Sequence, residues 1–469
     1  MNMEFEVVQN FYNGVAVFFV AYLIVYSTFL LLSVTVGSIS LYEQHKRQKL
    51  YNYLSHEYYM PVSIIVPAYN EAMTVVDTVN SLLSLDYNLY EIIVVDDGSK
   101  DETSRVLVEA FSMQKLERPI RKKVSCKEEE FVFITTGEKV NVTLIRTENG
   151  GKANALNMGI NASEYPYFVC IDADSMLQKD ALNNIMRPIL EDSTMIACGG
   201  LVRIVNDVTL RDGVVVEYKM PKNLLLCMQI LEYDRSFLAS RLLFDKFNGN
   251  LIISGAFGLF KKDMVIAVGG YDFETVGEDM ELVIRLHAYC RSNRIPYSIR
   301  YAADAVCWSQ APANLKSLKS QRRRWHIGLF QSIWKHKQLI LNPAYGIISF
   351  VSFLYFLIYE LLSPYIELFG LLTILIAYQF NLINVPFMLT FLLIYAFFSG
   401  MVTIIAFFSR VHAMDIQLHV GDVLKAISLC LIENIVLRFI LVFIRIFAFK
   451  GYRKGKMNWG EIKRFHMKK

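Results

Sequence analysis

Long apolar stretches stand on both sides of a mixed polar region in this chain of 469 residues. The first stretch, residues 11–38, carries no charged side chain, and about 20 apolar residues are enough for one helical membrane crossing. A cleaved signal peptide begins with basic residues, whereas residues 1–10 contain Glu4 and Glu6 and neither Lys nor Arg. Basic residues follow at 45–49 and favour the cytosolic side. We therefore expect residues 1–40 to form a membrane helix with its N-terminus outside the cell.

Three further apolar stretches lie in the C-terminal part, at 345–379, 383–409 and 423–449. The first of them is too long for a simple crossing. It also contains Glu360, Pro364 and Glu367, which predict that it is broken or lines a cavity.

The last stretch contains Glu433, Arg438 and Arg445. It is either an in-plane interfacial helix or the polar wall of a channel. The tail at 450–469 is basic, which places it in the cytosol. A cytosolic domain and a cytosolic tail require an even number of crossings between them, so either 345–379 crosses twice or 423–449 does not cross.

The polar region from 61 to 330 alternates between strand and helix patterns. Short apolar runs typical of buried strands occupy 62–67, 91–97 and 167–172. Helical spacing of apolar residues occupies 71–85 and 101–113. Alternating strands and helices predict a parallel sheet covered on both faces. We expect an α/β domain at 41–330, interfacial and transmembrane helices that form a channel at 331–449, and the tail at 450–469.

Composition adds two limits. The chain is 54% hydrophobic with a net charge of only +4, so bulk charge does not suggest nucleic acid as a partner. The seven cysteines form no C-x-x-C pair, which favours reduced thiols in the cytosol. The charged segment 114–140 is expected to be a hairpin insertion with a solvated face.

Acidic residues end two of the predicted strands: Asp96 and Asp97 end one, and Asp172 and Asp174 follow another. Ligands of such sheets bind beyond the carboxyl ends of the strands, so we expect these acids in one crevice. Asp172 and Asp174 offer hard oxygen ligands for Mg²⁺ or Mn²⁺, which also binds diphosphate oxygens.

Two further motifs precede predicted helices. Residues 149–155 contain two glycines and Lys152, which suit a phosphate, although an ordinary helix-start turn explains them equally well. Gly277-Glu278-Asp279 precedes an amphipathic helix at 280–289. Asp279 suits a helix cap and also a general base for an attacking hydroxyl.

The sequence Gln321-Arg322-Arg323-Arg324-Trp325 lies just before the apolar C-terminal part. The arginines are either cytosolic topology signals or ligands of a diphosphate, which arginine binds bidentately. An indole beside them is a suitable platform for a sugar ring.

Together these motifs resemble the GT-A domain of family-2 glycosyltransferases, a Rossmann-like nucleotide-diphospho-sugar transferase fold. With the flanking helices, the resemblance extends to the processive membrane synthases of cellulose, hyaluronan and poly-N-acetylglucosamine. It implies that Asp279 is the catalytic base, that Asp174 binds the metal, and that Ser254–Gly258 is an acceptor-side loop. The residues that it assigns to substrate are Tyr69, Glu71, Asp96, Asp97, Lys152, Asp172, Glu278, Gln321, Arg324 and Trp325.

The function implied by this resemblance is processive, inverting polymerisation of a β-glycan from a UDP-sugar. The implied cofactor is Mg²⁺ or Mn²⁺, and the implied location is the plasma membrane, with several crossings and a cytosolic catalytic domain. The polymer is the growing acceptor and passes through the bilayer, and accessory export subunits are candidate partners. No match to the F-x-V-T-x-K loop or to the cyclic-di-GMP-binding domain of cellulose synthases occurs here, so we expect no control by that nucleotide within this chain.

The donor sugar is left open by the motifs. We expect UDP-glucose and a β-glucan, with the mixed-linkage (1,3;1,4) type included on resemblance alone. The alternatives are a UDP-N-acetylglucosamine-using synthase, a non-processive enzyme that transfers one sugar to a lipid, and a catalytically silent export subunit.

Overall fold

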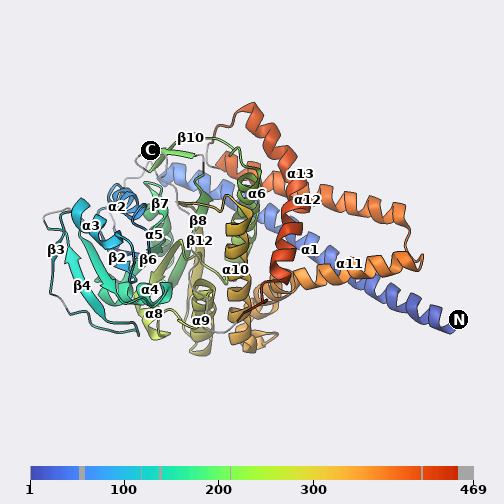
Figure 1. The fold of residues 1–469 in the computed structure, drawn as a ribbon, viewed down its shortest axis with the longest axis horizontal. Helices are drawn as coiled ribbons and strands as arrows, with labels where there is room; N and C mark the ends of the chain where they lie inside the picture. Colours follow the sequence, from blue (N-terminus) through green and yellow to red (C-terminus); the bar gives the residue numbers. More distant parts are fainter. Residues whose placement is uncertain are drawn as a thin grey trace.

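The computed structural model of the chain describes residues 2–51, 59–117, 119–136, 140–206, 208–211, 213–413 and 416–452. A sheet covered by helices lies at one end of the molecule, and long helices extend from it toward the other end (Figure 1). The α/β class of the domain and the helical membrane region are as predicted. Most of the basic tail, residues 453–469, lies outside the described residues.

The centre of the sheet is parallel and contains the strands that the apolar runs predict. Four strands lie side by side in the order β5 (Val142–Thr147), β2 (Tyr90–Asp96), β1 (Val62–Ala68) and β6 (Tyr167–Ile171). Because β2 and β6 both flank β1 and run parallel to it, the acids at their carboxyl ends come out at the same edge.

The outer strands make the sheet mixed, which corrects the expectation of a wholly parallel sheet. Beyond β6 follow β11 (Phe257–Lys261), β8 (Met195–Ile204), β12 (Ser298–Ser309) and β7 (Ser175–Leu177), and beyond β5 follow β4 (Glu129–Ile134) and β3 (Gln114–Lys115). β11 is antiparallel to β6 and β8, and β4 is antiparallel to β5. Only residues 135–141 separate β4 from β5 in the sequence, which is too short for the crossover that a parallel pair needs. A separate hairpin consists of β9 (Val208–Arg211) and β10 (Val214–Tyr218).

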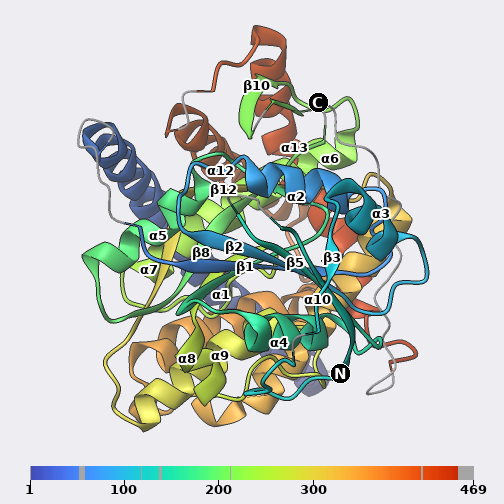
Figure 2. The ribbon, with the colours of Figure 1, turned by 90° about the vertical axis from the view of Figure 1, so that its left-hand side faces the viewer.

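Helices cover both faces of the sheet (Figure 2). One face carries α2 (Val75–Leu83), α3 (Thr103–Ala110) and α5 (Ala181–Glu191), and the other carries α4 (Lys152–Ala162), α8 (Lys262–Ala267) and α9 (Glu278–Ser292). Successive side chains of β1 alternate between these faces: Ile64 and Val66 belong to the first core, and Ile65 belongs to the second. This explains why β1 is apolar throughout.

Four helical segments connect the sheet to the long helices. They are α6 (Leu224–Tyr233), the π-helix η1 (Asp234–Ser240), α7 (Arg241–Asp245) and α10 (Leu315–Lys335). After α10 come the short 3₁₀ turns η2 (Lys337–Leu339) and η3 (Pro343–Tyr345).

Within the described residues, three helices are long and apolar enough to cross a membrane: α1 (Asn2–Tyr51), α12 (Val385–Ala413) and α13 (Val420–Ile446). A fourth candidate span combines the π-helices η4 (Ile348–Phe353) and η5 (Phe356–Leu361) with α11 (Ser363–Gln379), at a bend of 51°. Pro364 lies in the first turn of α11, where a proline is tolerated but prevents continuation of the preceding helix. The predicted break within 345–379 is therefore confirmed.

The helix α13 differs in direction from the other long helices. α11 and α12 extend alongside α1 away from the sheet, whereas α13 runs across them and close to α10 (Figure 1). The Arg323 guanidinium on α10 donates hydrogen bonds to the carbonyls of Ala448 and Lys450, just beyond α13, both at 2.7 Å. The end of α13 is thus attached to α10.

The helices α9 and α10 are in direct contact through two glycines. A Cβ atom on Gly328 of α10 would lie 2.7 Å from the Cα of Gly277, which precedes α9. Buried Glu281 of α9 contacts Lys335 at 3.0 Å and His336 at 3.1 Å, at the C-terminal end of α10. These contacts fix the position of one helix relative to the other.

Candidate active site

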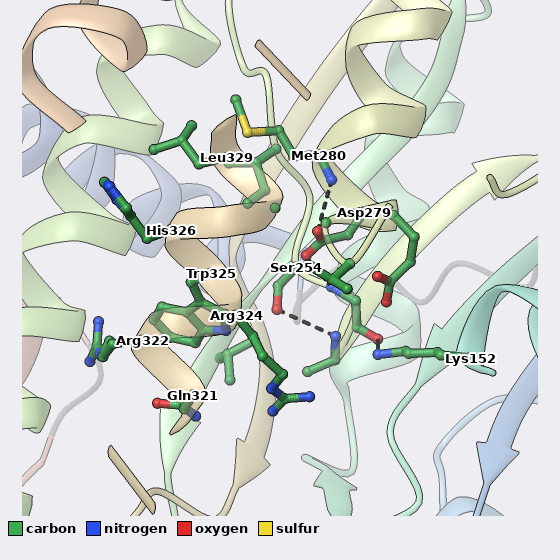
Figure 3. A pocket seen from close by; sticks show the side chains of 18 of the residues that line it. Lys152, Ser254, Asp279, Met280, Gln321, Arg322, Arg324, Trp325, His326 and Leu329 are labelled. Atoms are coloured by element: carbon green, nitrogen blue, oxygen red, sulfur yellow. Dashed lines mark hydrogen bonds between the residues drawn. The ribbon is translucent and has the colours of Figure 1, made fainter. Parts of the chain in front are cut away.

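A cavity of about 1260 Å³ begins at the carboxyl edge of the parallel strands and continues between the long helices. It brings together every predicted site residue except Asp96, namely Tyr69, Glu71, Asp97, Lys152, Asp172, Asp174, Glu278, Asp279, Gln321, Arg324 and Trp325. Figure 3 shows residues of α10 on one side of this cavity and Lys152 on the other, with Ser254 and Asp279 near Lys152.

Asp96 lies in the protein interior and not in the cavity lining. Its side chain is fully buried, accepts hydrogen bonds from the Ser99 N–H at 2.8 Å and from the Ser104 hydroxyl, and pairs with Arg146 at 3.2 Å. These contacts stabilise the loop after β2. Of the two adjacent acids, the structure therefore presents only Asp97 to a ligand.

Asp97 organises the glycine loop that follows β5. Its carboxylate accepts hydrogen bonds from the N–H groups of Gly150 at 2.9 Å and Gly151 at 2.7 Å, and from the Asn154 amide at 3.0 Å. The N–H groups of this loop, for which a phosphate site and an ordinary helix-start turn were left as alternatives, are thus bound to Asp97. Burial raises the pKa of Asp97 to about 6, against the effect of these hydrogen bonds.

Glu71 and Tyr69 lie in the loop after β1, beside this carboxylate. Glu71 is almost fully buried and accepts a hydrogen bond from the Thr74 hydroxyl at 2.8 Å, whereas Tyr69 is partly exposed. Both line the cavity. With Asp97, they line the part of the cavity at the carboxyl ends of β1 and β2.

Lys152 connects the two acidic motifs. Its Nζ atom is 2.5 Å from Asp172 Oδ1 and 3.3 Å from the Gly255 carbonyl oxygen. Burial lowers the pKa of Lys152, but the charges of Asp172 and Glu278 outweigh burial and raise the pKa above its ordinary value. Lys152 is therefore a fixed ammonium group between the acid at the end of β6 and the acids at the start of α9.

Asp279 is held in place by two backbone groups. Its carboxylate accepts hydrogen bonds from the N–H of Met280 at 2.8 Å and of Gly255 at 3.3 Å. Burial raises the pKa of Asp279, and it raises the pKa of the neighbouring Glu278 to about 7, while Lys152 opposes both shifts. A half-buried carboxylate with a raised pKa is suited to accept a proton near neutral pH.

The arginine-rich motif lies on α10, and its side chains take different directions. Gln321, Arg324 and Trp325 are spaced for one helix face, and all three line the cavity. Arg324 points toward the side of the cavity where Lys152 lies (Figure 3). Arg322 is buried, and Arg323 binds the end of α13, so these two arginines are held by the protein and are more than topology signals.

Asp172 and Asp174, which follow β6, suit a metal ion that binds together with the phosphates of a substrate. Asp172 and Asp174 both line the cavity. No group of three His, Cys, Asp or Glu side chains in the described part of the chain lies together so as to hold a metal. Mg²⁺ commonly takes one or two carboxylates and completes its shell with substrate phosphates and water, which is the arrangement that these residues allow.

Between the long helices, the cavity is lined by paired charges. The pairs are Arg235 with Glu433 at 2.6 Å, Arg438 with Glu367 at 2.7 Å, and Arg445 with Glu360 at 3.8 Å. One member of each pair belongs to α13. The charges of 423–449 thus form a polar cavity wall.

The sequence motifs did not indicate several charged residues of the cavity, among them Lys127, Glu232 and Arg235. Lys127 belongs to the segment that we expected to be a solvated face, yet its Nζ donates to the Asn149 carbonyl at 2.6 Å. Glu232 pairs with Arg322, 90 residues away. No local spacing relates these residues to their partners, so only the fold brings them to the cavity.

Comparison with known proteins assigns the chain to a family. Residues 63–268 match Glycosyl transferase family 2, and residues 167–409 match Glycosyl transferase family group 2. The chain belongs to glycosyltransferase family 2. The predicted fold class, the enzyme class and the resemblance to membrane synthases of this family are thereby confirmed.

Curated relatives of this glycosyltransferase include poly-beta-1,6-N-acetyl-D-glucosamine synthases. The protein of Staphylococcus epidermidis is 30% identical over 357 residues, which cover 71% of this chain and 75% of the relative. That of Staphylococcus aureus strain COL is 29% identical over 314 residues, with 66% and 65% covered. These names give no support to the β-glucan that we expected.

A solved structure supports the fold. A mannosyltransferase from Pyrobaculum calidifontis, in complex with GDP-Man and Mn²⁺, aligns with a TM-score of 0.52 at 17% identity, and the alignment covers 88% of this glycosyltransferase and 99% of that chain.

Proposed function

We propose that this glycosyltransferase is a processive, inverting synthase that polymerises β-linked N-acetylglucosamine from UDP-N-acetylglucosamine. The observation that carries the proposal is the continuous cavity. It begins at Asp97 and Asp174, passes Asp279 and Trp325, and continues between the long helices as far as Arg438. A product that remains in such a passage stays bound while the next donor enters, which is the requirement for processive synthesis.

N-acetylglucosamine replaces glucose as the proposed donor sugar because of the relatives. At 30% identity over most of the chain, a poly-beta-1,6-N-acetyl-D-glucosamine synthase is the better guide to the substrate than motifs that glucose-using synthases share. The β-1,6 linkage is proposed on the same basis.

Asp279 is the proposed base. A sugar hydroxyl is a weak nucleophile at neutral pH, and a carboxylate within hydrogen-bond reach removes its proton as it attacks the anomeric carbon. The backbone N–H groups of Met280 and Gly255 keep the carboxylate oriented. Attack on the face opposite the UDP leaving group inverts an α-linked donor to a β-linked product, without a covalent enzyme intermediate.

The remaining predicted residues are proposed to bind the donor and the acceptor. Tyr69, Glu71 and Asp97 lie at the end suited to the uridine, and Arg324 is placed to bind the diphosphate through its planar guanidinium. Trp325 presents its indole to the acceptor sugar. Lys152 holds Asp172 and neutralises the acids around the reaction centre.

A divalent cation, Mg²⁺ or Mn²⁺, is proposed to bind with the donor at Asp174 and Asp172. Such an ion stabilises the negative charge that develops on the diphosphate leaving group. The Mn²⁺ in the complex of the mannosyltransferase from Pyrobaculum calidifontis, which has the same fold, supports this assignment.

The proposed membrane arrangement uses three crossings, by α1, α11 and α12, with the sheet domain in the cytosol at the plasma membrane. In this arrangement α11 crosses the membrane from the cytosol to the outside and α12 returns to the cytosol. Two crossings then separate the sheet domain from the basic tail, an even number as the cytosolic tail requires. In this arrangement α13 lies along the cytosolic interface. Large apolar side chains are exposed on the three crossing helices, among them Val17, Ile24, Leu375, Ile376, Phe387 and Leu393, as expected for lipid contact.

A donor screen tests the proposed function. Purified full-length protein is incubated with radiolabelled UDP-N-acetylglucosamine, UDP-glucose or UDP-glucuronate, and the product is sized and digested with linkage-specific hydrolases. We expect a long product from UDP-N-acetylglucosamine alone, sensitive to a β-1,6-N-acetylglucosaminidase and lost in EDTA. A single-sugar product would show a non-processive transferase, and a polymer from UDP-glucose would restore the β-glucan expectation.

A further inference from the structure

Arg322 is a buried cation at the acceptor end of the cavity. The proposed reaction assigns no role to it. It is only 3% exposed, and a buried guanidinium is costly unless it is paired. Its two terminal nitrogens donate to the two carboxylate oxygens of Glu232 at 2.8 and 2.6 Å. Two parallel bonds fix the orientation of the guanidinium plane as well as its position.

The same guanidinium lies over the indole of Trp325. Its central carbon is 4.4 Å from the ring centroid, well within the range of a cation–π contact. Tyr233, the neighbour of Glu232 on α6, completes the group, with its ring centroid 6.3 Å from that of Trp325. Trp325 itself remains 45% exposed and lines the cavity, so the indole is fixed by a cation and still offers surface to a ligand.

We propose that Arg322 and Glu232 are positioning residues for the acceptor, which hold the Trp325 indole in the orientation that receives the terminal sugar of the growing polymer. This inference rests on the proposed polymerase function. Neither side chain is assigned a contact with the reacting atoms. Because Glu232 belongs to α6 and Arg322 to α10, the pair also sets the distance between these helices at the acceptor end.

Arg322 and Arg324 point in different directions, so we expect their loss to affect different ligands. Consecutive residues of an α-helix are rotated by about 100°, since there are 3.6 residues per turn. Arg324 consequently points toward the sheet side of the cavity (Figure 3), whereas Arg322 pairs with α6. Loss of Arg322 should therefore release the indole and weaken acceptor binding without weakening nucleotide binding.

Steady-state kinetics with a defined acceptor test the inference. The full-length enzyme extends a β-1,6-linked N-acetylglucosamine oligosaccharide, and the KM values of acceptor and UDP-N-acetylglucosamine are measured separately, together with UDP affinity and product length. The variants are Arg322→Lys, Arg322→Met, Glu232→Gln and the double variant Arg322→Met/Glu232→Gln. Lys319→Met is the matched control, because Lys319 is exposed on the same helix and does not line the cavity.

We expect the acceptor KM to rise about 5- to 30-fold in the Arg322 variants, the factor that corresponds to one cation–π contact, and the product to become shorter. The donor KM and UDP affinity should stay unchanged. Arg322→Lys should fail to restore the acceptor KM, since it keeps the charge and loses the planar fork. The double variant should be no worse than Arg322→Met, because the two residues act as one unit.

Two results would overturn the inference. One is an acceptor KM and a product length that match those of the unmutated enzyme and of Lys319→Met. The other is an equal rise in donor and acceptor KM, which would place Arg322 in the diphosphate site. If Arg322→Met does not fold, Arg322→Lys and Glu232→Gln decide by the same two criteria. If the unmutated enzyme does not extend the acceptor, the proposed function falls together with this inference.

Discussion

Asp279 is proposed to remove the proton of the attacking hydroxyl and to take no part in nucleotide binding. A neutral replacement tests both parts of this assignment. Asp279→Asn keeps the shape of the side chain and removes the base, and its single amide oxygen still accepts one of the two backbone hydrogen bonds, from Met280 or from Gly255. We expect turnover to fall roughly 10²- to 10⁴-fold, measured as UDP release, while UDP affinity is retained through Asp97 and Arg324. Asp263→Asn, an exposed position in the first turn of α8, is the control. Near-normal turnover by Asp279→Asn, or loss of its UDP affinity, would contradict the assignment.

The raised pKa values of Glu278 and Asp279 predict a loss of activity on mild acidification. Burial raises the pKa of both carboxyl groups, to about 7 for Glu278. The base must be ionised to act, so the active fraction falls as the pH drops through these raised values. A plot of kcat/KM against pH should therefore begin to decline at a higher pH than an ordinary aspartate would cause, with the folded state monitored at each pH. A flat profile down to the usual range of carboxyl groups would show that neither raised pKa governs the reaction.

The contact between α9 and α10 places the base relative to the arginine-rich motif. In Gly328→Ala the added methyl group would meet the backbone of Gly277 at 2.7 Å, so one of the two elements must shift. A displacement of this kind costs roughly 10²-fold in rate when it separates catalytic groups, and we expect about that loss of turnover. Gly421→Ala is the control, since nothing lies within 4 Å of its added Cβ. Equal turnover of both variants would show that the glycine contact does not position the site.

The arrangement of the long helices predicts which parts of the molecule are accessible from outside the cell. Single cysteines replace Glu109, whose side chain is 64% exposed on α3, and Gln379, exposed at the end of α11. We expect an impermeant thiol reagent to label Gln379→Cys in intact cells and Glu109→Cys only after permeabilisation. Six of the seven native cysteines are buried and Cys126 is partly exposed, so the unmutated protein gives the background. Labelling of Glu109→Cys in intact cells would reverse the proposed topology.

The local sequence pattern predicted individual strands and helices and the position of the acidic residues relative to them. Short apolar runs ended by Asp97 and Asp172 predicted β2 and β6 together with the edge at which a ligand binds, because parallel neighbours have their carboxyl ends at the same edge. Pro364 and two glutamates predicted the break before α11. Each of these conclusions depends only on residues close together in the chain.

Only the tertiary structure decided which of several adjacent, chemically alike residues reaches the cavity. Asp96 pairs with Arg146, whereas Asp97 lines the cavity. Arg322 and Arg324 both line the cavity, but Arg322 is paired with Glu232 of α6, and Arg323 binds the end of α13. The direction of α13 was likewise undetermined, since hydropathy reports length and apolarity but not orientation. The physical reason is the same in each case: periodicity sets the angle between neighbouring side chains, whereas the partner that each one meets depends on how elements distant in sequence pack together.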